Sequence, residues 1–582
     1  MALPFLRSLP LLLLLLPTSL REYYLPTATN NDAVVGEEPR HPIVLVPGAS
    51  CSELEARLTD AYQPSKPQCG AIKGKGWFEL WKNCSDLPAR HYVPCFMEQM
   101  RLVYNSTANE YGNFPGVEIR VPNFGSFTGF LRHPEHPDWC LHALRHELLP
   151  LGYRDGDALF GAPYDFRHAP PIPGQPSQVY AEYFRQLTTL VEDACRKQQG
   201  RKAILFGHSF GGTVVLEFAR AAPPAWRDRY IKRLVLVGPL PAAGFVQSIK
   251  NFASGSVVPY IPKTTPLSLR PMWRTLEAAI AAFPSPAVFG DDTPLVVTRR
   301  RNYTARDMAD LLADVGATDA VEPFRRRSIP RMSCFEAPMV PVTCINGVGA
   351  DTREQLMYWD GDFDKDPQVL YGDGDETINL ASMLAFDEEM RRQPGQREQY
   401  KSIKLPGATH SDIVTQEWSL KLIIQEMLDE LEAQLTDAYH PSKPQCGAMK
   451  GKGWFGLWRN YHDMPAYVQC FMEQMRLVYD PTTNEYENLP GVEVCVPNFG
   501  SSTGFLWHPE HPYVLFFSKK SRTDGLMCCT LGCRDWCLHP LRHELECLGH
   551  HNCVTLFGAP YDIRHAPPIP NQPSRVYARY FQ

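Results

Sequence analysis

The sequence predicts an α/β fold in which a mainly parallel sheet is covered by helices on both faces. Short apolar runs alternate with amphipathic helical segments along residues 41–434, an order typical of strand–helix–strand units. The apolar runs are continuous, as expected for strands that are buried on both faces. The chain has 582 residues, of which 44% are hydrophobic, so it is long enough to bury a large core.

The expected elements follow one another in chain order. Apolar runs bounded by Gly or Pro predict strands at 41–48, 157–160, 203–206, 233–239, 341–349, 367–378 and within 400–414. Helical spacing of apolar residues predicts helices at 139–153, 180–200 and 415–435. Together these segments are expected to form one domain over residues 41–434.

The first 20 residues, MALPFLRSLPLLLLLLPTSL, have the pattern of a secretory signal. Arg7 precedes an apolar run at 9–16, and small or polar residues follow. The run is far shorter than the roughly 20 residues that a membrane-spanning helix needs, and no other stretch is expected to span a bilayer. We therefore expect the secretory pathway, ending outside the cell or in a vacuole- or lysosome-like compartment. The alternative is an uncleaved signal anchor that keeps the protein on the membrane.

Passage through the secretory pathway would make three asparagines candidate glycosylation sites. Asn83, Asn105 and Asn302 each begin an N-x-[ST] sequon. The 17 cysteines would then be candidates for disulfides more than for metal ligands. A cysteine cluster at 528–537 has loose ligand-like spacing, but no His-x₃-His follows it in register, so no metal or cofactor is expected. The net charge of −6 gives no indication of nucleic acid, and no such partner is expected.

A candidate nucleophile lies in AILFGHSFGGT, which contains Gly207-His-Ser209-Phe-Gly211. The pattern G-x-S-x-G is weak by itself, but here an apolar strand precedes it and a helical segment follows. This is the context of a nucleophile elbow, a sharp turn that lifts the serine hydroxyl out of the sheet and leaves room only for small neighbours. The alternative is a glycine-rich turn that only packs.

A serine hydroxyl needs a base to accept its proton, and α/β-hydrolases place the acid and then the base later in the chain. Asp375 is the better candidate for the acid, because Ile378 follows it as an aliphatic anchor, and Asp373 is the alternative. His410 follows the last expected strand and precedes a helix, where a base could reach Ser209.

An oxyanion needs two backbone N–H donors. One is expected from Phe210, directly after the nucleophile. The other is expected from Ala49 in the loop after the first strand, since Pro47 has no N–H and Gly48 is expected to form the turn.

These residues together resemble the lecithin:cholesterol acyltransferase family, which includes lysosomal phospholipase A2. The resemblance runs over residues 41–432. It is carried by HPIVLVPGAS with LEARL, by GAPYDFR, by GHSFGG, by YGDGDETI and by ATHSDIV. Two positions depart from the family pattern. Phe166 replaces the tryptophan of GAPYDWR, and Ala49 replaces the polar residue usual after VPG, which removes a side chain but keeps the amide.

The resemblance implies an α/β-hydrolase fold with a cap or lid and a membrane-contacting loop. The segment between Cys69 and Cys95 looks like the loop that the family closes with a disulfide. A mobile lid is expected at 244–262. The segment between Cys69 and Cys95 is rich in aromatic residues, which suit insertion at a lipid interface. The alternative is that this segment folds onto its own core. The candidate lipid contacts are Trp77, Phe78, Leu80 and Trp81.

The resemblance also implies a two-step reaction at a phospholipid membrane or a lipoprotein-like surface. Ser209, activated by His410 and oriented by Asp375, would attack a fatty-acyl ester of a glycerophospholipid. The acyl group would then pass to water, as in a phospholipase A, or to an alcohol such as a sterol, as in an acyltransferase. Both acceptors use the same triad, so the choice stays open. The alternative from another class is a catalytically inactive secreted lipid-binding protein.

The C-terminal part of the chain is a partial duplication. Residues 54–184 recur as 431–581, with an insertion at 513–534, so residues 435–582 repeat 58–184. FGAPYDFRHAPPIP at 160–173 recurs as FGAPYDIRHAPPIP at 557–570. The second copy ends before any counterpart of the nucleophile, so it is expected to lack catalytic residues. One interpretation is an inert, poorly ordered copy, and the other is an added membrane-contacting module.

Overall fold

The computed structural model describes most of residues 40–428 and several short segments beyond them. The described ranges are 40–81, 93–133, 136–240, 243–256, 265–333, 336–428, 431–435, 454–458, 476–480, 485–488, 490 and 492–495. The chain divides into the units Met1–Arg40 and His41–Gln582. The expected signal segment, Asn83 and the insertion at 513–534 lie outside the described residues. Within the described ranges, no helix is long and apolar enough to cross a membrane.

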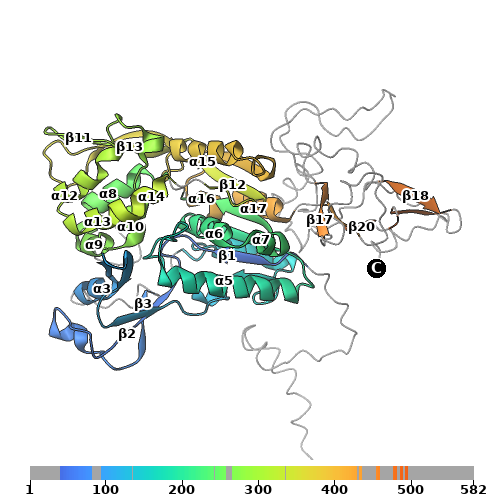
Figure 1. Cartoon of the computed structure of the whole chain (residues 1–582), viewed down its shortest axis with the longest axis horizontal. Helices are drawn as coiled ribbons and strands as arrows, with labels where there is room; N and C mark the ends of the chain where they lie inside the picture. The colour runs from blue at the N-terminus through green and yellow to red at the C-terminus, as the bar shows by residue number, and fades with distance from the viewer. Residues whose placement is uncertain are drawn as a thin grey trace, which may run out of the picture. The chain divides into compact units, whose positions relative to one another are not determined.

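A six-stranded parallel sheet forms the centre of the domain (Figure 1), in the order β15-β12-β9-β8-β1-β7. Its strands are β1 (Ile43–Val46), β7 (Leu159–Gly161), β8 (Ala203–His208), β9 (Ile231–Val237), β12 (Val342–Val348) and β15 (Tyr400–Pro406). In register, Leu45 pairs with Gly161 on one side and Phe206 on the other. The α/β-hydrolase fold predicted from the sequence is confirmed.

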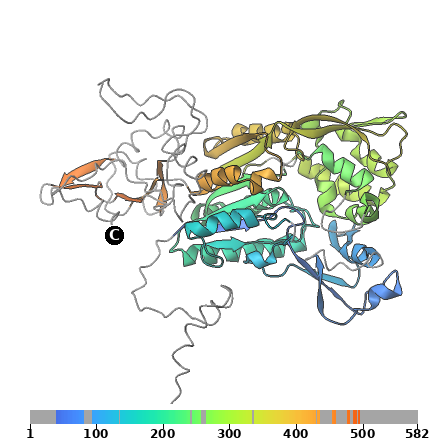
Figure 2. The ribbon, with the colours of Figure 1, turned by 180° about the vertical axis from the view of Figure 1, so that it is seen from behind.

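Helices cover both faces of this sheet, as views from opposite sides show (Figures 1 and 2). Val44 and Val46 of β1 belong to the same core cluster as residues of α5 (Gln178–Lys197), α6 (Phe210–Ala221) and α15 (Leu380–Arg392). Their neighbours Ile43 and Leu45 belong to a second cluster with α4 (His142–Leu148), α16 (Asp412–Thr415) and α17 (Glu417–Leu428). Successive strand residues point to opposite faces, which is why the central strand β1, IVLV, is apolar throughout.

A small β-rich module, residues 54–120, is inserted between β1 and β7. Its three-stranded sheet has the order β3-β2-β6, and β4 pairs with β5 as a hairpin. The elements are β2 (Leu54–Leu58), β3 (Trp77–Trp81), α3 (Val93–Met100), β4 (Leu102–Asn105), β5 (Glu110–Asn113) and β6 (Val117–Arg120). The disulfide Cys69–Cys95 is present, as the family resemblance implies. We call residues 54–120 the accessory module.

The candidate lipid-contacting residues form strand β3 of this module, not an open loop. Leu80 and Trp81 are only 4% and 2% exposed, so the expectation that they contact lipid is wrong. Neighbouring strand residues point to opposite faces, so both faces of β3 are covered at its end, at Leu80 and Trp81, whereas Trp77 to Glu79 are less buried. Aromatic content alone does not reveal this difference along the strand. Trp77 and Phe78 are half-buried, and the guanidinium groups of Arg57 and Arg120 lie 5.0 and 4.4 Å from the Trp77 ring centroid.

A cap domain follows β9. It combines helices with a four-stranded sheet of order β11-β10-β13-β14 (Figure 1). Its elements include α8 (Val246–Ser254), α9 (Pro266–Trp273), α10 (Glu277–Ala281), α12 (Met308–Asp314), β10 (Val296–Val297), β11 (Asn302–Tyr303), β13 (Ala350–Met357) and β14 (Gln368–Gly374). Helix α8 occupies the first part of the lid expected at 244–262. It is packed, since Val246, Ile249 and Phe252 are buried in the cap core, so this part is not the mobile lid that was expected. Residues 257–262 lie outside the described part.

The described strands of the second copy repeat the pairing of the accessory module. The strands are β16 (Leu431–Leu435), β17 (Trp454–Trp458), β18 (Leu477–Asp480), β19 (Glu485–Asn488) and β20 (Val492–Cys495). Ala433 pairs with Phe455 as Ala56 pairs with Phe78, and both strand pairs are irregular after the first residue. The sheet order β17-β16-β20 likewise matches β3-β2-β6. These described strands therefore have the same local pairing as the accessory module.

Helix α17 (Glu417–Leu428) is shorter than the sequence predicts. The expected helix at 415–435 ends at Leu428, and Leu431–Leu435 is strand β16. LEAQL repeats LEARL of β2, and strand pairing overrides its helical propensity.

Candidate active site

Ser209 lies on a strained turn between strand β8 and helix α6. It has φ 54° and ψ −126°, a conformation that L residues rarely adopt. A Cβ on Gly207 would lie 2.5 Å from the Gly211 carbonyl oxygen, and one on Gly211 would lie 2.3 Å from that of Pro47. Both positions therefore require glycine, as the elbow motif predicts.

The structure brings Ser209, His410 and Asp375 together. His410 Nε2 lies 2.9 Å from Ser209 Oγ, and His410 Nδ1 lies 2.8 Å from Asp375 Oδ2. An N–H at Nδ1 that donates to the carboxylate leaves Nε2 free to accept the serine proton. The arrangement therefore has the geometry of a nucleophile, a general base and an orienting acid.

The backbone after β14 holds the Asp375 carboxylate in place. Its Oδ1 accepts hydrogen bonds from the amides of Thr377 and Ile378 at 3.1 and 2.6 Å, and the side chain is fully buried. The alternative acid, Asp373, lies on β14, is exposed and accepts from the Gly349 amide. Of the two candidates, only Asp375 faces His410.

The charges around His410 favour its protonated form. Burial lowers the pKa of His410, but the Asp375 carboxylate outweighs this effect and raises the pKa above its ordinary value. His208, which sequence reasoning missed, lies beside it with ring centroids 5.1 Å apart, and its Nε2 lies 3.3 Å from the His410 carbonyl oxygen. Burial, together with the nearby His410, lowers the pKa of His208 to about 3, so His208 stays neutral. Its only sequence signal is its place before the nucleophile.

The loop that follows β1 lies beside the nucleophile. A Cβ on Gly48 would lie 3.3 Å from Ser209 Cβ. Among the backbone hydrogen bonds outside helices and strands in the described part of the chain, neither the Ala49 nor the Phe210 amide is a donor. Ser50, the next residue, has φ 67°. The positions are consistent with the predicted oxyanion donors.

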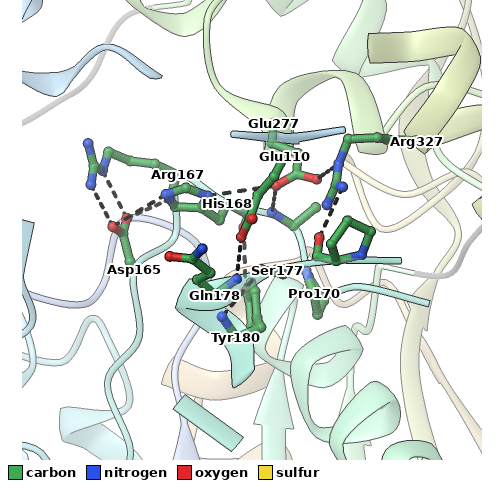
Figure 3. Close-up of polar contacts among 12 residues, drawn as sticks. Glu110, Asp165, Arg167, His168, Pro170, Ser177, Gln178, Tyr180, Glu277 and Arg327 are labelled. Atoms are coloured by element: carbon green, nitrogen blue, oxygen red, sulfur yellow. Dashed lines mark hydrogen bonds and ion pairs between the residues drawn. The ribbon is translucent and has the colours of Figure 1, made fainter. Parts of the chain in front are cut away.

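A buried charged network surrounds the GAPYDFRH segment (Figure 3). Arg167 lies 2.6 Å from Asp165 and donates to Asn113 of the accessory module at 2.7 Å. His168 Nδ1 lies 3.8 Å from Glu277 of the cap, which also pairs with Arg327. The network therefore joins the accessory module, the sheet domain and the cap. The motif GAPYDFR contains Asp165 and Arg167, whereas Glu277 and Arg327 carry no motif and sequence reasoning missed them.

The carboxylates of this network are held ionised. Burial raises the pKa of Asp165, but Arg167 outweighs it and the pKa lies below the ordinary value. Burial acts in the same direction on Glu277, and His168 and Arg327 together lower its pKa. Each carboxylate thus stabilises the fold in its charged form.

The remaining predicted site residues are distributed over the surface. Asn105 is exposed at the end of β4, and Asn302 is exposed on β11.

A second disulfide, Cys51–Cys140, joins the loop after β1 to the segment before α4 and was not predicted. Across the described ranges, no group of three or more His, Cys, Asp or Glu side chains could hold a metal ion.

Comparisons with known proteins identify the family of this chain. The family model "Lecithin:cholesterol acyltransferase" matches residues 77–329 and again 454–582. A lecithin-cholesterol acyltransferase-like 1 protein of Oryza sativa subsp. japonica is 39% identical over 393 residues, covering 67% of this chain and 87% of that protein. A human lysosomal phospholipase A and acyltransferase is 30% identical over 397 residues, covering 67% and 91%. A solved Tle4-Tli4 complex aligns at a TM-score of 0.43 with 10% identity, over 65% of this chain and 96% of that one. The chain belongs to the lecithin:cholesterol acyltransferase family.

Proposed function

We propose that this protein is a serine-nucleophile lipid enzyme that removes a fatty-acyl group from a glycerophospholipid and passes it to an acceptor. The observation that carries the proposal is the contact chain from Ser209 Oγ to His410 to the buried Asp375 in a member of this family. No metal or cofactor is needed for this chemistry.

The first step forms an acyl-enzyme. His410 Nε2 accepts the Ser209 proton while Oγ attacks the ester carbonyl carbon. The amides of Ala49 and Phe210 stabilise the oxyanion, and Asp375 stabilises the imidazolium. His410 then donates its proton to the leaving oxygen, and the lysophospholipid departs while the acyl group stays on Oγ.

The second step transfers the acyl group. His410 takes a proton from water or from an alcohol, the resulting oxygen nucleophile attacks the acyl-enzyme, and Ser209 recovers its proton. Water gives a free fatty acid, and an alcohol such as a sterol gives a new ester. The names of the rice and human relatives cover both outcomes.

The setting that we propose is a phospholipid membrane or lipoprotein-like surface inside or beyond the secretory pathway. The disulfides Cys51–Cys140 and Cys69–Cys95 support an oxidising compartment. Glycosylation at Asn105 and Asn302 fits their exposure. Membrane association through an uncleaved N-terminal anchor is the alternative, and N-terminal sequencing of the purified protein separates the two.

A fluorophosphonate probe tests the nucleophile. We expect labelling of the wild type and none of Ser209→Ala. Absence of labelling in the wild type, or labelling that survives the substitution, would support the alternative of an inactive lipid-binding protein. For the acceptor, radiolabelled phosphatidylcholine vesicles are incubated with and without sterol. Labelled sterol ester indicates transfer, and free fatty acid alone indicates hydrolysis.

A further inference from the structure

We propose that Trp81 is a positioning residue for the oxyanion loop, residues 48–51, and that it couples this loop to the accessory module and the cap. The proposal rests on the proposed function, because it concerns the amide of Ala49 as an oxyanion donor. Trp81 ends strand β3, far from the reacting serine in sequence and without a predicted catalytic role.

The oxyanion loop contains a backbone conformation that needs support. Ser50 has φ 67°, which costs free energy in a residue with a Cβ. Its carbonyl oxygen accepts a hydrogen bond of 2.8 Å from the Trp81 indole Nε1. The turn is closed by a bond from the Cys51 amide to the Gly48 carbonyl at 3.2 Å. Since the Ala49 amide lies inside this turn, its direction depends on the peptide that Trp81 holds.

Trp81 is itself fixed by aromatic residues from three different elements. The ring centroid of Trp81 lies 6.0 Å from that of Phe96 in α3, 5.3 Å from Phe166 of GAPYDFR and 6.4 Å from Trp273 in α9. The indole is 2% exposed, so it has little freedom to rotate. A side chain held on three sides can hold the Ser50 carbonyl in one place.

Through these contacts Trp81 touches the accessory module, the sheet domain that carries Phe166, and the cap. Phe96 follows the disulfide-bonded Cys95 of the accessory module, and Trp273 belongs to the cap. A displacement of the accessory module or of α9 would therefore move the indole and, through it, the oxyanion loop. Loss of one oxyanion donor lowers kcat by about 10²–10³-fold in serine hydrolases, so partial misalignment should have a measurable effect.

The test compares Trp81→Phe with Trp226→Phe. Trp226 is a matched control, because its Nε1 also donates a hydrogen bond, to Glu192 at 2.8 Å, and its ring packs against Phe218. The substrate is a soluble short-chain ester, which removes effects of lipid-surface binding. Because removal of one oxyanion donor lowers kcat by about 10²–10³-fold, we expect the misalignment in Trp81→Phe to lower kcat/KM by about 10-fold or more. We expect Trp226→Phe to change kcat/KM by less than about twofold.

The second readout separates positioning from general packing. A trifluoromethyl ketone that adds to Ser209 mimics the oxyanion, and a non-hydrolysable ether lipid mimics only the ground state. We expect Trp81→Phe to lower the affinity for the ketone in proportion to the loss in kcat/KM. The affinity for the ether lipid should remain that of the wild type. Equal weakening of both ligands, or activity equal to that of Trp226→Phe, would overturn the proposal.

A more conservative variant keeps the test decisive if Trp81→Phe does not fold. Site-specific replacement of Trp81 by benzothienylalanine keeps the two-ring shape and removes only the N–H group. The same selective loss of ketone affinity is expected, and unchanged affinity would refute the role of the hydrogen bond. Fluorophosphonate labelling of the wild type separates the two possible failures. If Ser209 is labelled but the Trp81 variants keep full ketone affinity, only the role of Trp81 is refuted. If Ser209 is not labelled, the proposed function itself fails.

Discussion

The Nε2 atom of His410 lies 2.9 Å from the hydroxyl oxygen of Ser209, although 201 positions separate the two residues in the chain. Strands β8 and β15 are not neighbours in the sheet, but both run in parallel and end at the same edge. The nucleophile and the base follow these strand ends, which is why they meet.

Asp375→Asn should remove most of the activity, whereas Asp373→Asn should not. An asparagine at 375 cannot stabilise the imidazolium and favours the wrong tautomer of His410, so kcat/KM should fall by about 10³–10⁴-fold. Asp373, on β14 two residues before Asp375, is the matched control, because it is exposed and accepts a hydrogen bond from the Gly349 amide. Steady-state kinetics on a soluble ester measure both variants. A larger loss at 373 than at 375 would contradict the assignment.

The pH dependence of kcat/KM should report the raised pKa of His410. The base acts only when it is neutral, so activity falls as pH drops through this pKa. Because Asp375 raises the pKa, the acid limb should lie above the ordinary histidine value of about 6.5. In Asp375→Asn the burial effect remains without the carboxylate, so the residual activity should have its acid limb at lower pH. An unchanged limb in that variant would refute the assigned cause.

Removal of either disulfide should destabilise the protein, and Cys51–Cys140 should matter more. The two bonds span 89 and 26 residues. Loop-closure entropy then gives about 4–5 and 3–4 kcal/mol of unfolding free energy, respectively. Paired Cys→Ser variants, unfolded in urea, measure the difference. Loss of Cys51–Cys140 should also lower kcat/KM, since Cys51 belongs to the oxyanion loop, whereas an unaltered rate would show that the loop is held without the bond.

Glu277→Gln should destabilise the fold by about 3–5 kcal/mol, because it leaves the buried Arg327 guanidinium without its carboxylate. Asp310→Asn, which breaks an exposed pair with Arg301, should cost less than about 1 kcal/mol. The lowered pKa of Glu277 means that its contribution is complete above the unfolded-state pKa and disappears as pH falls through the folded-state value. Urea unfolding between pH 3 and 7 should therefore show a weaker acid dependence in Glu277→Gln than in the wild type.

Truncation after Gln434 should leave the activity intact. The truncated chain keeps α17, whose buried residues Ile423 and Met427 complete the helical layer on the sheet. It loses β17 to β20, which pair only with β16 or with each other among the described strands. Soluble-ester kinetics and vesicle assays should be run together. Retained ester activity with reduced vesicle activity would instead support a membrane-contacting role for the second copy.

The sequence by itself determined the local parts of this protein. Continuous apolar runs predicted the buried strands, and the pattern around Ser209 predicted its elbow, because both depend on neighbours within a few residues. Asp375 and His410 could be named because each follows an expected strand at the place where this fold puts an acid and a base. The repeat of residues 54–184 was evident from identity alone.

Only the tertiary structure decided which side chains meet across long separations. Aromatic content suggested that Trp81 faces lipid, yet the packing of β3 against α3 and α9 buries it and directs its N–H to Ser50. Glu277 and Arg327 have no local signature and become a network only where the cap meets GAPYDFRH. LEAQL is helical by propensity, but pairing with β17 and β20 makes it a strand. Burial and pairing are properties of the whole fold, so a linear pattern cannot assign them.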